Sequence, residues 1–384
     1  MSLVSELRMS STDKRKEADV NFKYFESKAQ QIKLSKSVQN QRDSFLKTPV
    51  NQLDLSSVES IRDLVSAWSR TSIQSRSISE CAQVYENMIS DPDRPTIMLG
   101  LSGALIAGGL RKVIRDLVEA GFVDVIVSTG AILYQDIYQG RGFSHYMGTP
   151  RADDALLHDL YIDRIYDAYV DEVGFVKTDD AIGEIAAGLE PRKYSTREFM
   201  KVLGDNASED PNSIVKTAAK HGVPVFCPAI ADSSIGIGLA GLYRAAKKSG
   251  RKLMQLDTIQ DNYEIAQIVL KSKKTGSIYI GGGVPKNYIN DAAVMLDYTP
   301  GHSYVFQITA DAPHWGGLTG STLDEAKSWG KVSKKATRAT AYVEATIGLP
   351  LVAGYVLGSL DLVRNRKHLK FDWKGDALEK ITRG

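Results

Sequence analysis

The sequence predicts an α/β fold built on a parallel β-sheet that is covered by helices on both faces. Short apolar runs of strand length recur along the chain, and segments with helical spacing separate them. Small residues such as Gly, Ser and Thr directly follow several of these runs. Because parallel strands are joined by crossover helices, this alternation favours a parallel sheet.

Composition and length are compatible with one large domain. A chain of 384 residues with 43% hydrophobic content can bury one large core or two modest ones, and the regular alternation favours one. We therefore expect a single α/β domain over residues 49–384. Residues 1–48 are rich in Lys, Ser, Gln, Glu and Asp, which predicts a polar N-terminal arm that is mobile or docks elsewhere. Residues 57–90 carry apolar side chains at helical spacing, which predicts an N-terminal helical extension.

The first two predicted strands open into stretches of small residues. Residues 96–99 lead into Gly100-Leu101-Ser102-Gly103, and residues 123–127 lead into Ser128-Thr129-Gly130. A helix that ends near Gly121 connects them, since glycine is favoured just past a helix end. The stretch from 140 to 210 is less regular. Further strands are expected at 223–228, 252–256, 277–281 and 303–308, followed by a long helical segment from about residue 338 that bends near Pro350.

A parallel sheet of this kind binds ligands beyond the carboxyl ends of its strands, where the strand order reverses. The small residues at these ends let backbone N–H groups approach a pyrophosphate. One competing motif, residues 236–241, matches G-x-G-x-x-G and is trailed by Asp257, which is the layout of a dinucleotide fingerprint. Seven residues separate the preceding strand from its first glycine, so we interpret these glycines as allowing close packing of a helix on the sheet. Pyrophosphate binding is the alternative.

Lys331 is the main candidate for covalent chemistry. It closely follows Trp329, and Glu325 lies about one helical turn before the tryptophan. A partly apolar pocket favours the neutral amine of a lysine, which is the nucleophilic form. Trp329 would then face a cationic amine, and Glu325 would take an ammonium group. The local alternative is an ordinary capped helix start at 321–325, with Trp329 in the core and Lys331 in solvent.

Composition gives no support to several other functions. The 48 Lys and Arg nearly balance the 46 Asp and Glu, so neither nucleic acid nor a membrane is expected as a partner. No membrane-spanning run or secretory signal is evident, which predicts a cytoplasmic protein. Cys81 and Cys227 lie far apart and the six histidines show no ligand spacing, so we expect buried thiols and no metal site. Walker and G-x-S-x-G motifs are absent from the sequence.

The order and spacing of five motifs resemble the deoxyhypusine synthase family over roughly residues 50–360. They are Pro228-Ala229 with Asp232, Gly281-Gly282-Gly283-Val284, Ile308-Thr309-Ala310, Ser328-Trp329-Gly330-Lys331 and Leu349-Pro350-Leu351. The resemblance implies a Rossmann-like NAD-binding fold and a homotetramer with sites shared across dimer interfaces. It also implies that NAD takes hydride from spermidine and that a lysine carries the aminobutyl group as an imine. The acceptor in this family is a lysine of a hypusine-type translation factor or, in close relatives, the diamine putrescine.

By this resemblance Lys331 is the catalytic lysine, Trp329 and Glu325 line the amine channel, and Asp232 lies near both the substrate and the nicotinamide. The resemblance further implies that NAD contacts a larger set of residues. This set comprises Ser102, Gly103, Ser128, Thr129, Gly130, Gln135, Asp232, Gly282, Gly283, Thr309, Ala310, Glu344 and Ala345.

Four departures from the family pattern bear on the substrate. Ile237 and Gln135 stand where the family has an aspartate and a glutamate, Asn287 replaces a histidine, and residues 313–318, with His314, replace an acidic loop. Because a polycation is recognised by carboxylates, we expect a modified amine site in which Asn287, Ile237 and His314 take part. The predicted function is NAD-dependent aminoalkyl transfer from a polyamine such as spermidine. The alternatives are a homospermidine-synthase-like enzyme with a diamine acceptor and a non-catalytic NAD-binding protein.

Overall fold

The computed structural model describes residues 28–384, and the chain divides into two compact units between Val50 and Asn51. In the first unit the described elements are α2 (Lys28–Gln31) and α3 (Lys36–Phe45). Ser35 caps α3 by accepting a hydrogen bond from the Val38 amide, and α3 has no buried residue. Most of the predicted polar arm, up to residue 27, lies outside the described residues.

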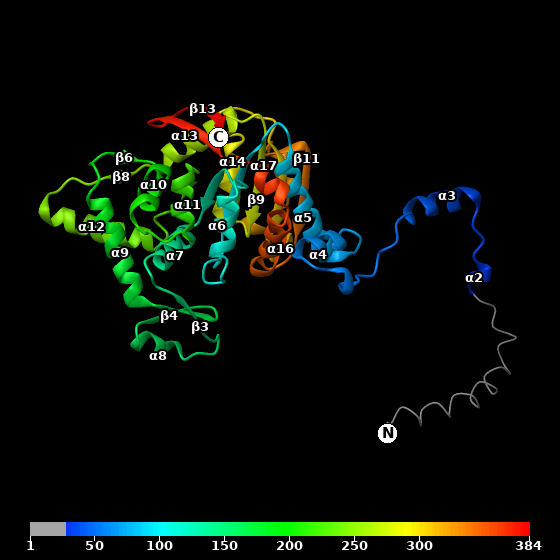
Figure 1. Ribbon diagram of the computed structural model, residues 1–384, viewed down its shortest axis with the longest axis horizontal. Coiled ribbons are helices and arrows are strands. Elements are labelled where there is room, and N and C mark those ends of the chain that lie inside the picture. The colour runs from blue at the N-terminus through cyan, green and yellow to red at the C-terminus, as the bar shows by residue number, and fades with distance from the viewer. Residues whose placement is uncertain (1–27) are drawn as a thin grey trace, which may run out of the picture. The chain divides into compact units, whose positions relative to one another are not determined.

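The second unit is built on a six-stranded parallel sheet (Figure 1), as predicted. The strands lie in the order β11-β10-β9-β1-β2-β7, so the chain starts at the centre, runs outward to β7, and returns to β9 on the other side of β1. The reversal between β1 and β9 is the switch point of a doubly wound sheet. The strands are β1 (Thr96–Leu101), β2 (Val125–Ser128), β7 (Val225–Phe226), β9 (Thr275–Ile280), β10 (His302–Ile308) and β11 (Val332–Ala341).

Helices cover both faces of this sheet, and alternate strand residues enter two separate hydrophobic clusters. In β1, Leu99 belongs to one cluster and Met98 to the other. The first cluster packs against α4 (Ile61–Trp68), α5 (Ile73–Ser90), α6 (Arg111–Glu119), α7 (Gly130–Gly140), α10 (Thr196–Asn206), α11 (Ile214–His221) and α16 (Ala345–Leu357). The second packs against α13 (Thr258–Lys271), α14 (Gly283–Ala292) and α15 (Leu323–Ser328). The expected helical extension is confirmed as α4 and α5, and both cysteines are buried as predicted.

Two predicted elements differ from the structure. The strand expected at 252–256 is present as β8 (Gln255–Leu256), but it lies outside the central sheet, because it pairs only with β6 (Lys193–Tyr194). The helix expected from about residue 338 begins at Ala345 and contains Pro350, because β11 continues to Ala341. The sequence of β11 is rich in the helix formers Ala, Lys and Arg, and pairing with β10 overrides that local preference.

Several small elements were not predicted. A three-stranded antiparallel sheet, in the order β3-β5-β4, consists of β3 (His145–Met147), β4 (Ile162–Ile165) and β5 (Ala168–Asp171). It lies with α8 (Asp154–Asp159) at one end of α9 (Glu172–Ala187) (Figure 1). After α17 (Leu360–Asn365), the hairpin β12 (Leu369–Lys374) and β13 (Ala377–Arg383) is fixed to α13, because the Gln267 side chain bonds to backbone atoms of Asp376 and Leu378. Within residues 28–384 no helix is long and apolar enough to cross a membrane.

Candidate active site

A cavity of about 870 Å³ opens at the carboxyl ends of β1, β9, β10 and β11, beside the switch point of the sheet. Six residues that the sequence analysis assigned to NAD line it: Ser102, Gly103, Thr309, Ala310, Glu344 and Ala345. Thr319 and Asp311 also line the cavity. The cavity therefore lies where the sequence analysis expected the cofactor, because each of these segments follows a strand. The role of these residues in NAD binding stays a prediction.

The wall between β1 and β9 is closely packed. Gly281 has a left-handed backbone, with φ of 71°, and a Cβ there would lie 2.4 Å from the Ser102 hydroxyl oxygen. The Ser102 hydroxyl accepts a hydrogen bond of 2.8 Å from the Gly282 amide. On the opposite side Glu344 caps α16 by accepting a hydrogen bond from the Thr346 amide. The cavity thus has small residues on one wall and a carboxylate at a helix N-terminus on another.

Lys331 lies beyond this cavity, on the turn between α15 and β11. Its Nζ lies 2.6 Å from Oδ1 of Asp291 and donates a hydrogen bond of 3.2 Å to Oδ1 of Asn287. The same nitrogen lies 5.3 Å from the centre of the Trp329 ring, within the range of a cation–π contact. Asn287 and Asp291 are one turn apart on α14, and the Asn287 amide also donates to Asp291. Lys331, Trp329 and Asn287 are thus brought together as predicted, whereas Asp291 was missed.

Lys286, next to Asn287 on α14, connects the cavity at the strand ends with the surroundings of Lys331. Its ammonium group donates to Gln307 Oε1 (3.0 Å), the Thr319 carbonyl (3.1 Å) and the Ser321 carbonyl (2.5 Å). The side chain is 1% exposed, and this burial lowers the pKa of Lys286 to about 8. Because Thr319 lines the cavity, Lys286 fixes one cavity wall to the helix that holds Lys331.

The other predicted amine-binding residues are spread over three elements. Glu325 is exposed on α15. Burial lowers the pKa of Lys286, and the negative charge of Glu325 partly opposes this effect. His314 lies against Trp315, with ring centres 4.4 Å apart. Asp232 and Ile237, which is 63% exposed, lie at the start of α12 (Ser234–Ser249). No hydrogen bond or ion pair among residues 28–384 joins these two residues to Lys331.

The remaining predicted NAD contacts do not line the cavity. Ser128, Thr129 and Gly130 follow β2, where a Cβ on Gly130 would lie 2.3 Å from the Ser233 hydroxyl oxygen. Gly282 and Gly283 begin α14, and the Gly283 amide donates to the Thr319 hydroxyl. Gln135 is buried within α7, and its Oε1 has no hydrogen-bond partner among the described residues. A role in cofactor binding stays a prediction for this group and for Asp232.

The G-x-G-x-x-G motif lies inside helix α12 and serves close packing, as the sequence analysis favoured. The packing partner is helix α9, however, and not the sheet. A Cβ on Gly238 would lie 2.6 Å from the carbonyl oxygen of Asp179, and a Cβ on Gly183 of α9 would lie 3.4 Å from the Gly238 carbonyl. These contacts require two helices that approach each other closely.

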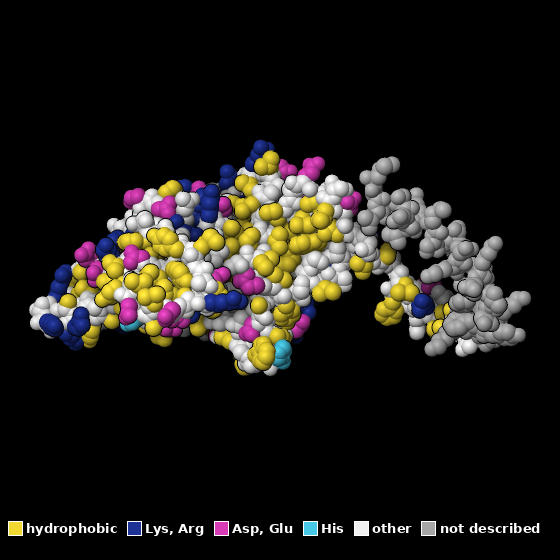
Figure 2. Space-filling model, turned by 90° about the horizontal axis from the view of Figure 1, so that it is seen from below, with side chains coloured by type: hydrophobic (Ala, Val, Ile, Leu, Met, Phe, Trp, Pro, Cys, Tyr) yellow, Lys and Arg dark blue, Asp and Glu magenta, His cyan; other side chains and the backbone are white. Residues whose placement is uncertain are grey.

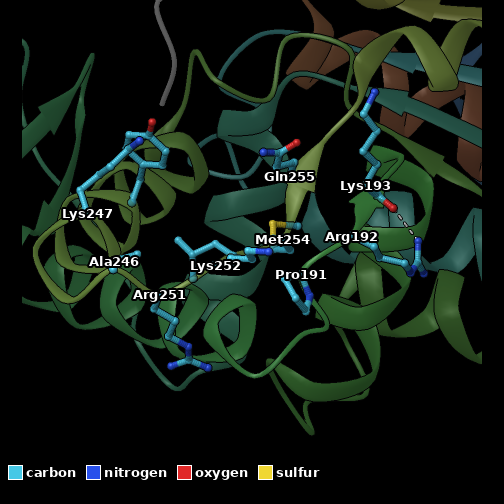
Figure 3. A pocket seen from close by; sticks show the side chains of 12 residues that line it. Pro191, Arg192, Lys193, Ala246, Lys247, Arg251, Lys252, Met254 and Gln255 are labelled. Carbon is cyan, nitrogen blue, oxygen red and sulfur yellow. Dashed lines mark hydrogen bonds between the residues drawn. The ribbon is translucent and has the colours of Figure 1, made fainter.

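A second cavity, of about 590 Å³, lies between the end of α12 and the segment before α10 (Figure 3). Its cationic lining residues are Arg192, Lys193, Lys247, Arg251 and Lys252. Two of them are paired, Arg192 with Glu198 and Lys193 with Asp257. No carboxylate occurs among its lining residues, so this cavity would repel a cationic amine. We therefore place the candidate site at the strand ends.

Apolar side chains are unusually exposed around the candidate site. Trp315 and Trp329 are 72% and 65% exposed. Figure 2, which marks neither tryptophan, shows hydrophobic side chains in several patches on one face of the molecule. Large exposed apolar patches are typical of surfaces that another molecule covers. The predicted homotetramer stays a prediction.

Fold and cavity together define an α/β protein with a candidate ligand site at the switch point of a parallel sheet. Residues 63–356 match the family model described as deoxyhypusine synthase. The chain is 43% identical over 345 residues to "Probable deoxyhypusine synthase 2" of Methanosarcina mazei. The match covers 87% of this chain and 97% of that relative. It is 40% identical over 326 residues to a "Deoxyhypusine synthase-like protein" of Coxiella burnetii, covering 83% and 91% of the two chains. The chain belongs to the deoxyhypusine synthase family, which confirms the resemblance found in the sequence.

A solved structure supports the fold. A putative deoxyhypusine synthase from Entamoeba histolytica matches with a TM-score of 0.55 and 20% identity, over 80% of this chain and 97% of that one. At this identity the likeness concerns the fold alone.

Proposed function

We propose that this protein is an NAD-dependent aminoalkyl transferase that acts through an imine on Lys331. The observation that carries the proposal is the placement of Lys331 beside the Trp329 ring, where Asn287 and Asp291 hold its amine. A lysine fixed against an indole suits a substrate that is a cationic amine. Membership of the deoxyhypusine synthase family supports the same chemistry.

The cavity at the strand ends fits a dinucleotide. Small residues and the hydroxyl groups of Ser102 and Thr309 allow a close approach to its walls, and none of the described lining residues is Lys or Arg. Ser102, Thr309 and Glu344 would hold NAD, with the Glu344 carboxylate accepting from a ribose hydroxyl. This carboxylate and that of Asp311 would repel the additional phosphate of NADP. Bound NAD would supply a reversible hydride acceptor for the carbon next to the substrate nitrogen.

The chain's own residues would handle the amines. Trp329 would pack against the substrate, and Glu325 and Asp232 would hold its ammonium groups or assist proton transfer. Once its ammonium group has passed a proton to Asp291, the neutral amine of Lys331 would attack the oxidised carbon, expelling 1,3-diaminopropane when spermidine is the donor. The acceptor amine would then displace Lys331 in the same manner, and return of the hydride would give a secondary amine.

Trapping of the covalent intermediate tests this proposal. The protein with NAD and spermidine is treated with borohydride, and the modified peptide is mapped by mass. We expect the adduct on Lys331, and we expect Lys331→Ala to abolish group transfer while slow amine oxidation persists. An adduct on Lys286, which is buried and has a lowered pKa, would disprove the assigned role. NAD binding without any adduct would favour the non-catalytic NAD-binding alternative.

The nature of the acceptor is a separate prediction. We expect this protein to be a poor spermidine-dependent deoxyhypusine synthase. Ile237 cannot balance a charge, and both functional ends of the Asn287 amide are engaged by Lys331 and Asp291. A charge-assisted hydrogen bond typically contributes about 1.5–3 kcal/mol, so its loss alters amine recognition. The products from spermidine, putrescine and agmatine, as donors and acceptors, are identified by mass. A small-amine product supports the homospermidine-synthase-like alternative, whereas efficient transfer to a hypusine-type translation factor would refute this prediction.

A further inference from the structure

The hairpin formed by β4 and β5 reaches the candidate cofactor cavity. Four consecutive residues, Ile165 to Ala168, line the cavity opposite the strand ends. Ile165 pairs with Ala168, which leaves Tyr166 and Asp167 as the two-residue turn between the strands. No sequence motif pointed to this segment, because it lies in the irregular stretch between the predicted strands.

The backbone of this turn is unusual. Tyr166 adopts a left-handed conformation with φ of 56°, which favours glycine. The turn is fixed from outside the cavity, since the guanidinium of Arg164 donates to the Tyr166 carbonyl (2.9 Å) and the Gly148 amide donates to the Asp167 carbonyl (2.8 Å). Arg164 is held in turn by a two-pronged ion pair with Asp154. A strained non-glycine residue in a well-braced turn at a cavity is a reason to look for a function of its side chain.

The side chains of the turn remain free. Tyr166 is 75% exposed, and within residues 28–384 neither its ring nor the Asp167 carboxylate has a hydrogen bond or ion pair. The other walls carry small residues, hydroxyl groups and the carboxylates of Glu344 and Asp311, and among the described residues that line the cavity only Tyr166 has an aromatic ring. An aromatic face stacks on a planar base, and a carboxylate accepts hydrogen bonds from sugar hydroxyls.

We propose that Tyr166 and Asp167 complete the dinucleotide site, with the Tyr166 ring stacked on a planar ring of the ligand and Asp167 accepting from a ribose hydroxyl. This inference rests on the proposed NAD-binding function. It assigns the β4–β5 hairpin, a segment outside the central sheet, to the recognition of the cofactor.

The structure offers a matched control. Tyr161, at the other end of β4, also has a left-handed backbone, with φ of 55°, and is 62% exposed, but it does not line the cavity. Tyr166→Gly and Tyr161→Gly therefore remove the same side chain from the same backbone conformation. The affinity of each full-length variant for NAD is measured by isothermal titration calorimetry, and its melting temperature is recorded without ligand.

We expect Tyr166→Gly to weaken NAD binding at least about five-fold, from the typical contribution of base stacking. Tyr161→Gly should bind NAD as the wild type does, and neither melting temperature should fall, since glycine relieves the left-handed strain. Tyr166→Phe should retain affinity, because the ring is kept.

The outcomes separate the inference from the function on which it rests. If the wild-type protein does not bind NAD, the proposed function fails. If the wild type binds NAD and Tyr166→Gly binds it equally well, only the inference is overturned. A loss of affinity shared by Tyr161→Gly, or accompanied by a lower melting temperature, would assign the effect to the fold of the hairpin and would also overturn it.

Discussion

Lys286 on helix α14 and Lys331, whose ammonium group contacts the same helix, occupy opposite environments. Lys331 meets a carboxylate, Asp291, and lies beside an exposed indole. Lys286 is enclosed and donates only to neutral oxygens. Without a carboxylate partner, its charged form loses solvation that is not fully replaced, and the pKa of Lys286 falls to about 8. Lys286 is therefore a structural clamp, which holds helix α14 to the backbone at Thr319 and Ser321. Burial of its charge lowers the free energy of unfolding.

The clamp predicts a pH dependence of stability. Lys286 has a pKa of about 8 in the folded protein, below its ordinary value of 10.5. Between these values the unfolded chain binds more protons than the folded chain, so this residue makes the free energy of unfolding rise with pH. We expect urea unfolding at pH 8 and pH 10 to show this gain in the wild type and in Lys335→Met, an exposed control. Lys286→Met should lack it, and an equal gain in that variant would contradict the lowered pKa.

At the scale of single residues, the sequence was informative where a combination of residue types occurs in only a few structural or chemical roles. A lysine after tryptophan and glycine drew attention to Lys331, and the structure places this lysine beside the Trp329 ring. Its role in amine transfer stays a prediction. Asp291 and Tyr166 could not be predicted, because an aspartate on a helix and a tyrosine in a turn are common and only the tertiary fold brings them to the site.

At the level of elements, the contact between α9 and α12 depends on glycine at defined positions. A Cβ on Gly238 would lie 2.6 Å from a backbone oxygen of α9, which cannot move without shifting that helix. Gly241, three residues later on α12, has open space around it. A Cβ on Gly236 would also lie 2.4 Å from a backbone oxygen, that of Ala231, so two glycines of the G-x-G-x-x-G motif are required by packing and Gly241 is not.

This difference gives a paired prediction. Gly238→Ala should lower the free energy of unfolding by about 1–3 kcal/mol through overpacking. Gly241→Ala should raise it by about 0.5–1 kcal/mol, because alanine favours a helix more than glycine does. Both variants should bind NAD like the wild type when folded. Chemical denaturation and calorimetry measure the two quantities, and a loss of NAD affinity in Gly238→Ala at unchanged stability would instead support the fingerprint interpretation.

The elements that could be predicted are those whose burial is visible in composition. Strands β1 and β2 are mostly apolar, and β9 and β10 contain shorter apolar stretches, because both of their faces are covered. β11 lies at the edge of the sheet, where only some of its residues are buried, so its alanines and lysines suggested a helix. The antiparallel strands β3, β4 and β5 are short and only partly buried, so they have no apolar run that would mark them as strands.

At the scale of the whole molecule, the second unit contains both hydrophobic clusters, and within residues 31–50 every side chain is exposed. We expect a chain that starts at Asn51 to fold with the melting temperature of the full-length protein to within about 2 °C, a change smaller than that caused by about 1 kcal/mol. Its NAD affinity should also be unchanged. Thermal denaturation of both forms checks this, and a clear drop would show that the first 50 residues stabilise the fold.

The strand order also affects how the chain folds while it is being synthesised. β1 occupies the centre of the sheet, but its neighbour β9 begins about 170 residues after β1 ends. At roughly 5–20 residues per second, a ribosome would need about 10–35 s to produce that neighbour. During this interval the edge of β1 that later pairs with β9 has no partner strand. Exposed strand edges of this kind favour aggregation. Efficient production of this protein in a cell should therefore depend on a chaperone that binds the nascent chain before β9 emerges.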